Sequence, residues 1–213
     1  MARPARSLWP QGSPPPPVAT IISLFPGQFS TLELAFRKTG LFDKLNSTEY
    51  PHEGGTLFAP TNFAFAKLGP KINAFLFSKY GEKYLKALLE YHIVVNQTLY
   101  SDAFFDATKT EDESVSGRSP YYHYDLPTAL ENHFLSVDVF RYGPFISIKI
   151  NGFSSVTTHD GIASDGVIQV VSNVLIPPKN ARGETVFWKG EEMSVGEFKE
   201  RLEPFVKEDN LEL

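Results

Sequence analysis

The first half of the chain carries apolar residues with the period of an α-helix. The clearest case is the segment 82–92, in which positions spaced i, i+3, i+4 and i+7 share one helical face, namely Leu85, Leu88, Leu89 and His92. The capping-box pattern of residues 30–33 predicts an earlier helix that begins at Ser30 and ends near Gly40. Thr61 or Asn62 is expected to cap a further short helix.

The second half of the chain alternates apolar and polar residues, which is the period of a half-buried strand. The alternation covers residues 135–139 and 146–150. Asn151-Gly152 follows the second run and predicts a two-residue hairpin turn, because both residues tolerate a positive φ. A third strand is therefore expected around residues 155–158.

Two other segments are apolar without alternation, as buried strands are. Residues 56–59 predict a short buried strand that ends at Pro60, since proline cannot donate a hydrogen bond to a neighbouring strand. Residues 167–176 are apolar on both faces, which predicts a central strand. A second capping pattern at residues 194–197 predicts a last helix that ends near Pro204.

This order of elements, helices first and strands afterwards, predicts an α+β fold. The chain has 213 residues, of which 42% are hydrophobic, and this is enough for one well-filled core. We expect three parts. Residues 1–18 form a disordered, proline-rich lead-in, residues 19–178 form the folded domain, and residues 179–213 form a C-terminal extension with a short helix.

Composition excludes several classes of function. The chain has no cysteine, which rules out disulfides, thiolate metal sites and cysteine catalysis. Its net charge is -5 and its cations are scattered, so it lacks the basic patch of a nucleic-acid-binding protein. No apolar run reaches the length of a membrane span, and the proline-rich start lacks the apolar centre of a signal peptide.

No pattern of reactive residues points to catalysis, a cofactor or a metal. The histidines lack zinc-ligand spacing, and neither a calcium loop, a phosphate-binding glycine loop nor a nucleophile elbow occurs. The acidic run 111–113 is expected to be a solvated loop, because catalytic carboxylates need distinct, partly buried environments. We therefore expect a protein that is not an enzyme.

Three segments together resemble the fasciclin domain family. Residues 56–65 are similar to its first signature, residues 89–94 to its central tyrosine-histidine motif, and residues 163–171, continued by 174–177, to its second signature. The resemblance implies two packed β-sheets with several flanking helices, in which the two signatures are neighbouring core strands. The C-terminal tail resembles that of filamentous-fungal members.

The same resemblance implies a module for adhesion between cells or between cells and matrix, often secreted or tethered and often glycosylated. Two positions depart from the family pattern. Ser172 replaces a residue that is often acidic, and Gly161 replaces an aliphatic residue after Asp160. Both lie near segments proposed as integrin contacts in animal members, so integrin binding is not expected here.

Three groups of residues are candidate sites, each with a structural alternative. Tyr91 and His92 are either an adhesive contact or part of the buried helix face, and the structural interpretation is favoured because a lone histidine on an apolar face is usually paired inside. Asn46 and Asn96 each begin an N-glycosylation acceptor pattern.

The third group is the aromatic cluster of residues 121–124. Tyr121, Tyr122 and Tyr124 either stack on a sugar or dock a partner, or they pack the preceding loop onto the domain. The second interpretation is favoured, because composition alone supports the first.

We therefore expect a non-catalytic adhesion or interaction module of a fungal cell surface or wall, with no cofactor. Its partner would be a cell-surface or matrix protein, a polysaccharide or a second copy, and it would reach a membrane only through a tether outside this chain. Two alternatives stay open. One is a small-molecule-binding, lipid-binding or hydrolytic domain on the same scaffold, and the other is an interaction protein of the endomembrane system or the vacuole.

Overall fold

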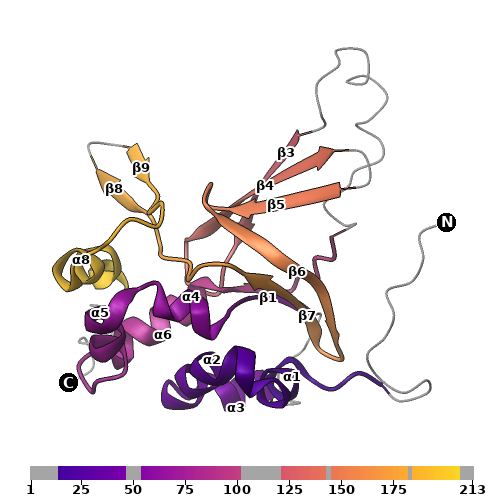
Figure 1. Ribbon diagram of the computed structural model, residues 1–213, viewed down its shortest axis with the longest axis horizontal. Helices are drawn as coiled ribbons and strands as arrows, with labels where there is room; N and C mark the ends of the chain where they lie inside the picture. Colours follow the sequence, from indigo (N-terminus) through magenta and orange to yellow (C-terminus); the bar gives the residue numbers. More distant parts are fainter. Residues whose placement is uncertain (1–13, 47–53, 102–120, 143–144, 182–183, 207–213) are drawn as a thin grey trace.

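The computed structural model describes residues 14–46, 54–101, 121–142, 145–181 and 184–206 (Figure 1). Most of the predicted lead-in and the acidic run 111–113 lie outside these residues. The helices are α1 (Val18–Leu24), α2 (Pro26–Lys38), α3 (Leu41–Asn46), α4 (Asn62–Ala66), α5 (Gly69–Leu76), α6 (Glu82–Tyr91) and α8 (Val195–Val206). The strands are β1 (Gly55–Pro60), β2 (Ile93–Val95), β3 (Tyr121–Pro127), β4 (Phe134–Tyr142), β5 (Phe145–Ile150), β6 (Ser154–Ala163), β7 (Gly166–Val171), β8 (Lys179–Ala181) and β9 (Glu184–Val186). The predicted α+β class is confirmed.

Seven strands follow one another in the order β2-β1-β7-β6-β5-β4-β3, and β8 and β9 form a separate hairpin. The long strand β6 connects two groups of strands, the β3–β4–β5 group and the β1–β7 region. Its first residues pair with β5 and the rest pair with β7. The pairing register of β6 shifts between Val156 and Thr158 and again before Gly161, so the strand bends where it passes between the groups. Figure 1 shows β6 as a curved ribbon that joins the β1–β7 region to the β3–β4–β5 group.

The two signature segments lie side by side as the parallel strands β1 and β7, with Leu57 opposite Ile168. Their close approach depends on Gly166, because a Cβ atom added there would lie 2.4 Å from the carbonyl oxygen of Gly55. β7 is buried along its whole length and lies between β1 and β6, as the sequence predicted for a central strand.

Helices cover the strands and share one continuous core with them. In Figure 1, α1, α2 and α3 lie together beneath β1 and β7, while α4, α5, α6 and α8 lie at one side. The predicted apolar face of α6 is fully buried, and the inward residues of β4 and β5 join the same core. These are Leu85, Leu88, Leu89 and His92 in and after α6, and Leu135, Val137, Val139, Ile148 and Ile150 in the strands.

The predicted helix at Ser30 is present, but its start was wrong. α2 begins at Pro26, where the fixed φ of proline suits the first turn, so Ser30 and Glu33 lie inside the helix. Glu33 therefore caps nothing, and its carboxylate instead accepts hydrogen bonds from Ser23 and Arg37.

Asn62 makes the contact that joins the first signature to α2. Its side-chain oxygen accepts the backbone N–H of Thr31 at 2.9 Å, and its amide nitrogen lies 3.2 Å from the carbonyl oxygens of both Pro26 and Gly27. Asn62 is thus inserted into the backbone hydrogen bonding of α2. Thr61 caps α4, as predicted, because its hydroxyl accepts the N–H of Ala64.

Three other boundaries differ from the sequence prediction. The turn after β5 contains three residues, since Ile150 pairs directly with Ser154, although Asn151 and Gly152 do adopt positive φ. The strand predicted for residues 167–176 ends at Val171. α8 continues through Pro204, because a proline near the end of a helix removes only one hydrogen bond from its last turn.

We predict that Leu88→Ala lowers the free energy of unfolding by about 2–5 kcal/mol, because Leu88 is fully buried and truncation leaves a cavity. Urea unfolding followed by circular dichroism measures this. The matched control is Leu34→Ala on α2, where the leucine is 56% exposed and the cost should stay below about 0.5 kcal/mol. Equal costs for the two substitutions would contradict this placement of the core.

Candidate interaction site

The tyrosine-histidine motif lies at the C-terminal end of α6, between the helix and the strands. His92 is fully buried and is the C-cap residue of the helix. Its Nδ1 atom donates to the carbonyl oxygen of Leu88 at 2.7 Å, and its Nε2 atom accepts the backbone N–H of Leu175 at 2.9 Å. These two bonds require a neutral ring with its proton on Nδ1.

Burial lowers the pKa of His92 to about 4, because the charged ring would lose its hydration. Protonation would also place a hydrogen on Nε2, where the N–H of Leu175 already points. The imidazole is therefore a neutral link between α6 and the segment that follows β7.

Tyr91 is equally buried and makes the second link from α6. Its hydroxyl donates to the carbonyl oxygen of Phe134 at 3.0 Å and accepts the side-chain N–H of Asn151 at 3.1 Å. Asn151 also accepts the backbone N–H of Ser136, so the hairpin turn after β5 is attached to both β4 and α6. Burial raises the pKa of Tyr91 well above its ordinary value. Because both members of the motif are buried, neither side chain is exposed to a binding partner.

The aromatic cluster is divided between the two faces of β3. Tyr121 lies on the solvent face and is 49% exposed, whereas Tyr122 and Tyr124 are half-buried and pack against the core. The cause is the alternation of side chains along a strand, which also places His123 beside Tyr121 on the outer face. The sequence interpretation treated the cluster as one unit, because a strand was not predicted there.

Asp138 of β4 organises the outer face of the β3–β4–β5 group. Its carboxylate accepts the hydroxyl of Tyr121 at 2.7 Å and the Nδ1–H of His123 at 2.8 Å. The hydrogen bond to Asp138 raises the pKa of His123, and the charge of Asp125 acts in the same direction. The face therefore combines an exposed aromatic ring with fixed polar groups.

The carboxylate of Asp160, the residue that precedes Gly161, is hydrogen-bonded to other residues of the domain. It accepts the N–H of Ser101 at 2.7 Å and the side-chain N–H of Gln169 at 2.9 Å, and it also bonds the Ser101 hydroxyl. Gln169 is fully buried in β7 and also donates to the carbonyl oxygen of Leu99. This network holds residues 99–101 against the bulge of β6, so Asp160 has a structural role.

The two acceptor asparagines lie at the ends of elements. Asn46 is the last residue of α3, and the rest of its acceptor pattern lies outside the described residues. Asn96 follows β2, is exposed and has a positive φ of 58°. Its neighbour Gln97 is fixed by a hydrogen bond from the Thr56 hydroxyl to its carbonyl oxygen.

A groove of about 490 Å³ runs along β2, the edge strand of the β1–β7 region. A second hollow of about 420 Å³ adjoins it between α6 and α8, and the two share Glu90, Ala129 and Glu131. Neither is lined by His92, His123 or Asp125, the polar residues whose presence in a pocket would favour a catalytic or ligand-binding domain. Within the described residues, no cluster of three metal-ligating side chains occurs.

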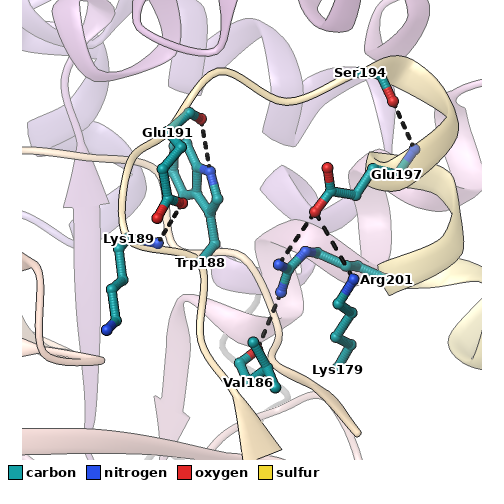
Figure 2. Close-up of polar contacts among 8 residues, drawn as sticks. All are labelled: Lys179, Val186, Trp188, Lys189, Glu191, Ser194, Glu197 and Arg201. Carbon is teal, nitrogen blue, oxygen red and sulfur yellow. Dashed lines mark hydrogen bonds and ion pairs between the residues drawn. The ribbon is translucent and has the colours of Figure 1, made fainter. Parts of the chain in front are cut away.

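The C-terminal extension packs against the domain through buried side chains (Figure 2). Trp188 is buried against Phe153 of the hairpin turn, with ring centroids 5.2 Å apart, and its Nε1–H donates to the carbonyl oxygen of Glu191. Figure 2 shows Arg201 of α8 between the carbonyl oxygen of Val186 and the carboxylate of Glu197. No role was predicted for Trp188 or Arg201, although the apolar run that ends at Trp188 is a usable signal that this tail packs on the domain.

Comparison with known proteins gives a consistent assignment. The fasciclin domain family model matches residues 27–177. The chain is similar to the aurofusarin biosynthesis cluster protein S of Gibberella zeae, with 31% identity over 192 residues that cover 84% of this chain and 47% of the relative. It thus spans about half the length of this curated relative.

Among solved structures, the chain is similar to a FAS1 domain pair from the insect cell adhesion molecule fasciclin I. The TM-score is 0.59, with 20% sequence identity, and the match covers 78% of this chain and 52% of that chain. At this identity the likeness shows the fold alone. The predicted α+β fold with flanking helices is thereby confirmed as the fold of this domain class.

We predict that the domain loses stability as the pH falls from 6.5 towards 4. In this window His92 is protonated in the unfolded chain but stays neutral in the folded state, because its pKa is lowered from 6.5 to about 4. The stability that is present above pH 6.5 is therefore lost on acidification. The loss from this residue should be about 2 kcal/mol at pH 5. Urea unfolding at pH 7 and pH 5 measures it.

The diagnostic variant is His92→Gln, which keeps a donor and an acceptor but does not titrate. Its unfolding free energy should change less between pH 7 and pH 5 than that of the wild type. His123→Gln is the matched control, because His123 is exposed and its raised pKa gives a contribution of opposite sign. An unchanged pH dependence in His92→Gln would show that this histidine is not the buried neutral link.

Proposed function

The chain belongs to the fasciclin domain family, and from this premise we propose that it is a non-catalytic adhesion module of a fungal cell surface or wall. Family membership carries the proposal, because fasciclin domains are generally adhesion or interaction modules rather than enzymes. The partner would be a cell-surface or matrix protein, a polysaccharide or a second copy of the chain.

The burial of Tyr91 and His92 supports a division between a rigid interior and a contact surface. A partner would meet side chains such as Tyr121, His123 and Asp138 on the outer face of the β3–β4–β5 group. Their mutual hydrogen bonds fix them before binding, which lowers the conformational entropy lost on association.

Fasciclin domains are typically extracellular or exposed at the cell surface, and we propose this location for the chain. None of the described helices is both long and apolar enough to cross a membrane. Exposed Asn96 and the helix-terminal Asn46 are the proposed glycan acceptors, since such asparagines are modified only in the secretory lumen.

We predict that the protein isolated from its source cell shifts on a gel after digestion with an N-glycosidase. Mass spectrometry should locate the glycan at Asn96, Asn46 or both. Thr98→Ala and Thr48→Ala are the control variants, since each removes one acceptor pattern and keeps its asparagine. Beads coated with the protein should then adhere to the cell wall or to one another. Unmodified protein in a cytosolic fraction, or beads that fail to adhere, would contradict the proposal.

A second candidate role is an accessory protein of a biosynthetic pathway. The observation that favours it is the name of the Gibberella zeae relative, which assigns that protein to a biosynthesis cluster. Such a role is compatible with a fasciclin domain that holds a pathway enzyme or a product outside the cell.

Deletion of the gene in its source organism separates the two roles. If the protein is an adhesion module, cell attachment should fall and the profile of small metabolites should stay unchanged. Loss of a metabolite with normal attachment would support the accessory role and contradict the adhesion role. Re-expression of the intact chain provides the control.

A further inference from the structure

The groove along β2 has the size of a small-molecule site. Its volume of about 490 Å³ lies within the range of roughly 300–1,000 Å³ that is typical of ligand pockets. β1 and β2 form one wall, α1 and α3 contribute Val18 and Leu41, and the loop after β3 closes the side with Thr128 and Ala129.

The walls of the groove are mainly apolar. Leu57 and Val94 are buried beneath it, and Ile93 and Val95 of the edge strand flank it, with Val95 41% exposed. The hydroxyl of Thr56 contributes little polarity, because it donates to the carbonyl oxygen of Gln97 and accepts the N–H of Leu99. The groove therefore favours a ligand with an apolar body.

Every charged residue that lines the groove, among the residues described, is acidic: Glu90, Glu131 and Asp165. The carboxylate of Asp165 is fixed at one end by the backbone N–H of Val18 at 2.8 Å. Glu90 and Glu131 lie where the groove adjoins the second hollow, since they line both, whereas Lys83 and Lys86 line the second hollow alone. A cleft with apolar walls and charge of one sign concentrates the electric field and attracts ligands of the opposite sign.

We infer that this groove binds a small organic cation, namely an apolar body that carries a protonated amine. The apolar body fills the space against β1 and β2, and the ammonium group lies near the Glu90 and Glu131 end. An organic anion of the same shape is repelled by the three carboxylates. This inference is independent of the adhesion role, because it concerns a different surface and a different class of ligand.

Three naphthalene derivatives of similar size test the charge preference: 1-naphthylmethylamine, 1-naphthylmethanol and 1-naphthoic acid. Binding to the full chain is measured by isothermal titration calorimetry at low salt. The amine should bind about two- to fivefold more tightly than the alcohol, which corresponds to an ion pair of roughly 0.5–1 kcal/mol, and the acid should bind most weakly. Equal affinities, or no binding of the amine, would overturn the inference.

Variants then locate the site. Glu131→Gln should remove part of the preference for the amine over the alcohol, whereas Glu200→Gln, at an exposed position of α8, is the matched control and should not. Val95→Trp fills the groove and should abolish binding of both compounds, whereas Tyr121→Trp adds bulk at an exposed position that does not line the groove and should not. Both tryptophan variants are first checked for an unchanged melting temperature. Amine binding that survives Val95→Trp would assign the ligand to another surface and overturn the inference.

Discussion

The neutral imidazole of His92 is the constraint on which the arrangement of helix and strands depends. It accepts one backbone N–H, from Leu175, and donates to one carbonyl, of Leu88, so it satisfies two main-chain groups that are 87 residues apart. Both partners are buried, and losing either bond would leave a polar group without water. Histidine suits this position because its neutral ring offers a donor and an acceptor on opposite sides.

Other short polar links repeat this solution at different boundaries of the fold. Asn62 joins the first signature to α2, Asn151 joins the hairpin turn to α6, and Asp160 with Gln169 holds the chain at the bulge of β6. Each uses a side chain with both donors and acceptors, or a carboxylate surrounded by donors. These side chains pair with main-chain groups that are not hydrogen-bonded within helices or strands. The result is a rigid scaffold in which the polar residues of the family motifs serve the interior.

Surfaces are therefore the part of the molecule available for recognition. The outer face of the β3–β4–β5 group carries an aromatic ring held by a carboxylate, and the β2 edge carries the acidic groove with apolar walls. The two differ in chemistry, since the first is open and mixed in charge and the second is concave and acidic. The C-terminal extension adds the β8–β9 hairpin and α8 to the domain and buries Trp188 and Arg201.

The sequence by itself determined the elements whose apolar residues are either periodic or continuous, because the pattern records which sides of an element face the core. It identified the buried face of α6, the alternation in β4 and β5, the buried strands β1 and β7 and the turn at Asn151-Gly152. It also supplied the three segments that resemble the family signatures, and two of them form the neighbouring core strands β1 and β7.

Only the tertiary structure decided what depends on partners far along the chain. The capping pattern at Ser30 predicted a helix start, but Pro26 and the side chain of Asn62, 31 residues beyond Thr31, set the geometry of α2. The division of Tyr121 from Tyr122 required the pairing of β3 with β4, and the acidic groove required β2, α3 and the loop after β3 to meet. Local pattern fixes which residues are buried, whereas the identity of each polar partner depends on the folding of distant segments onto one another.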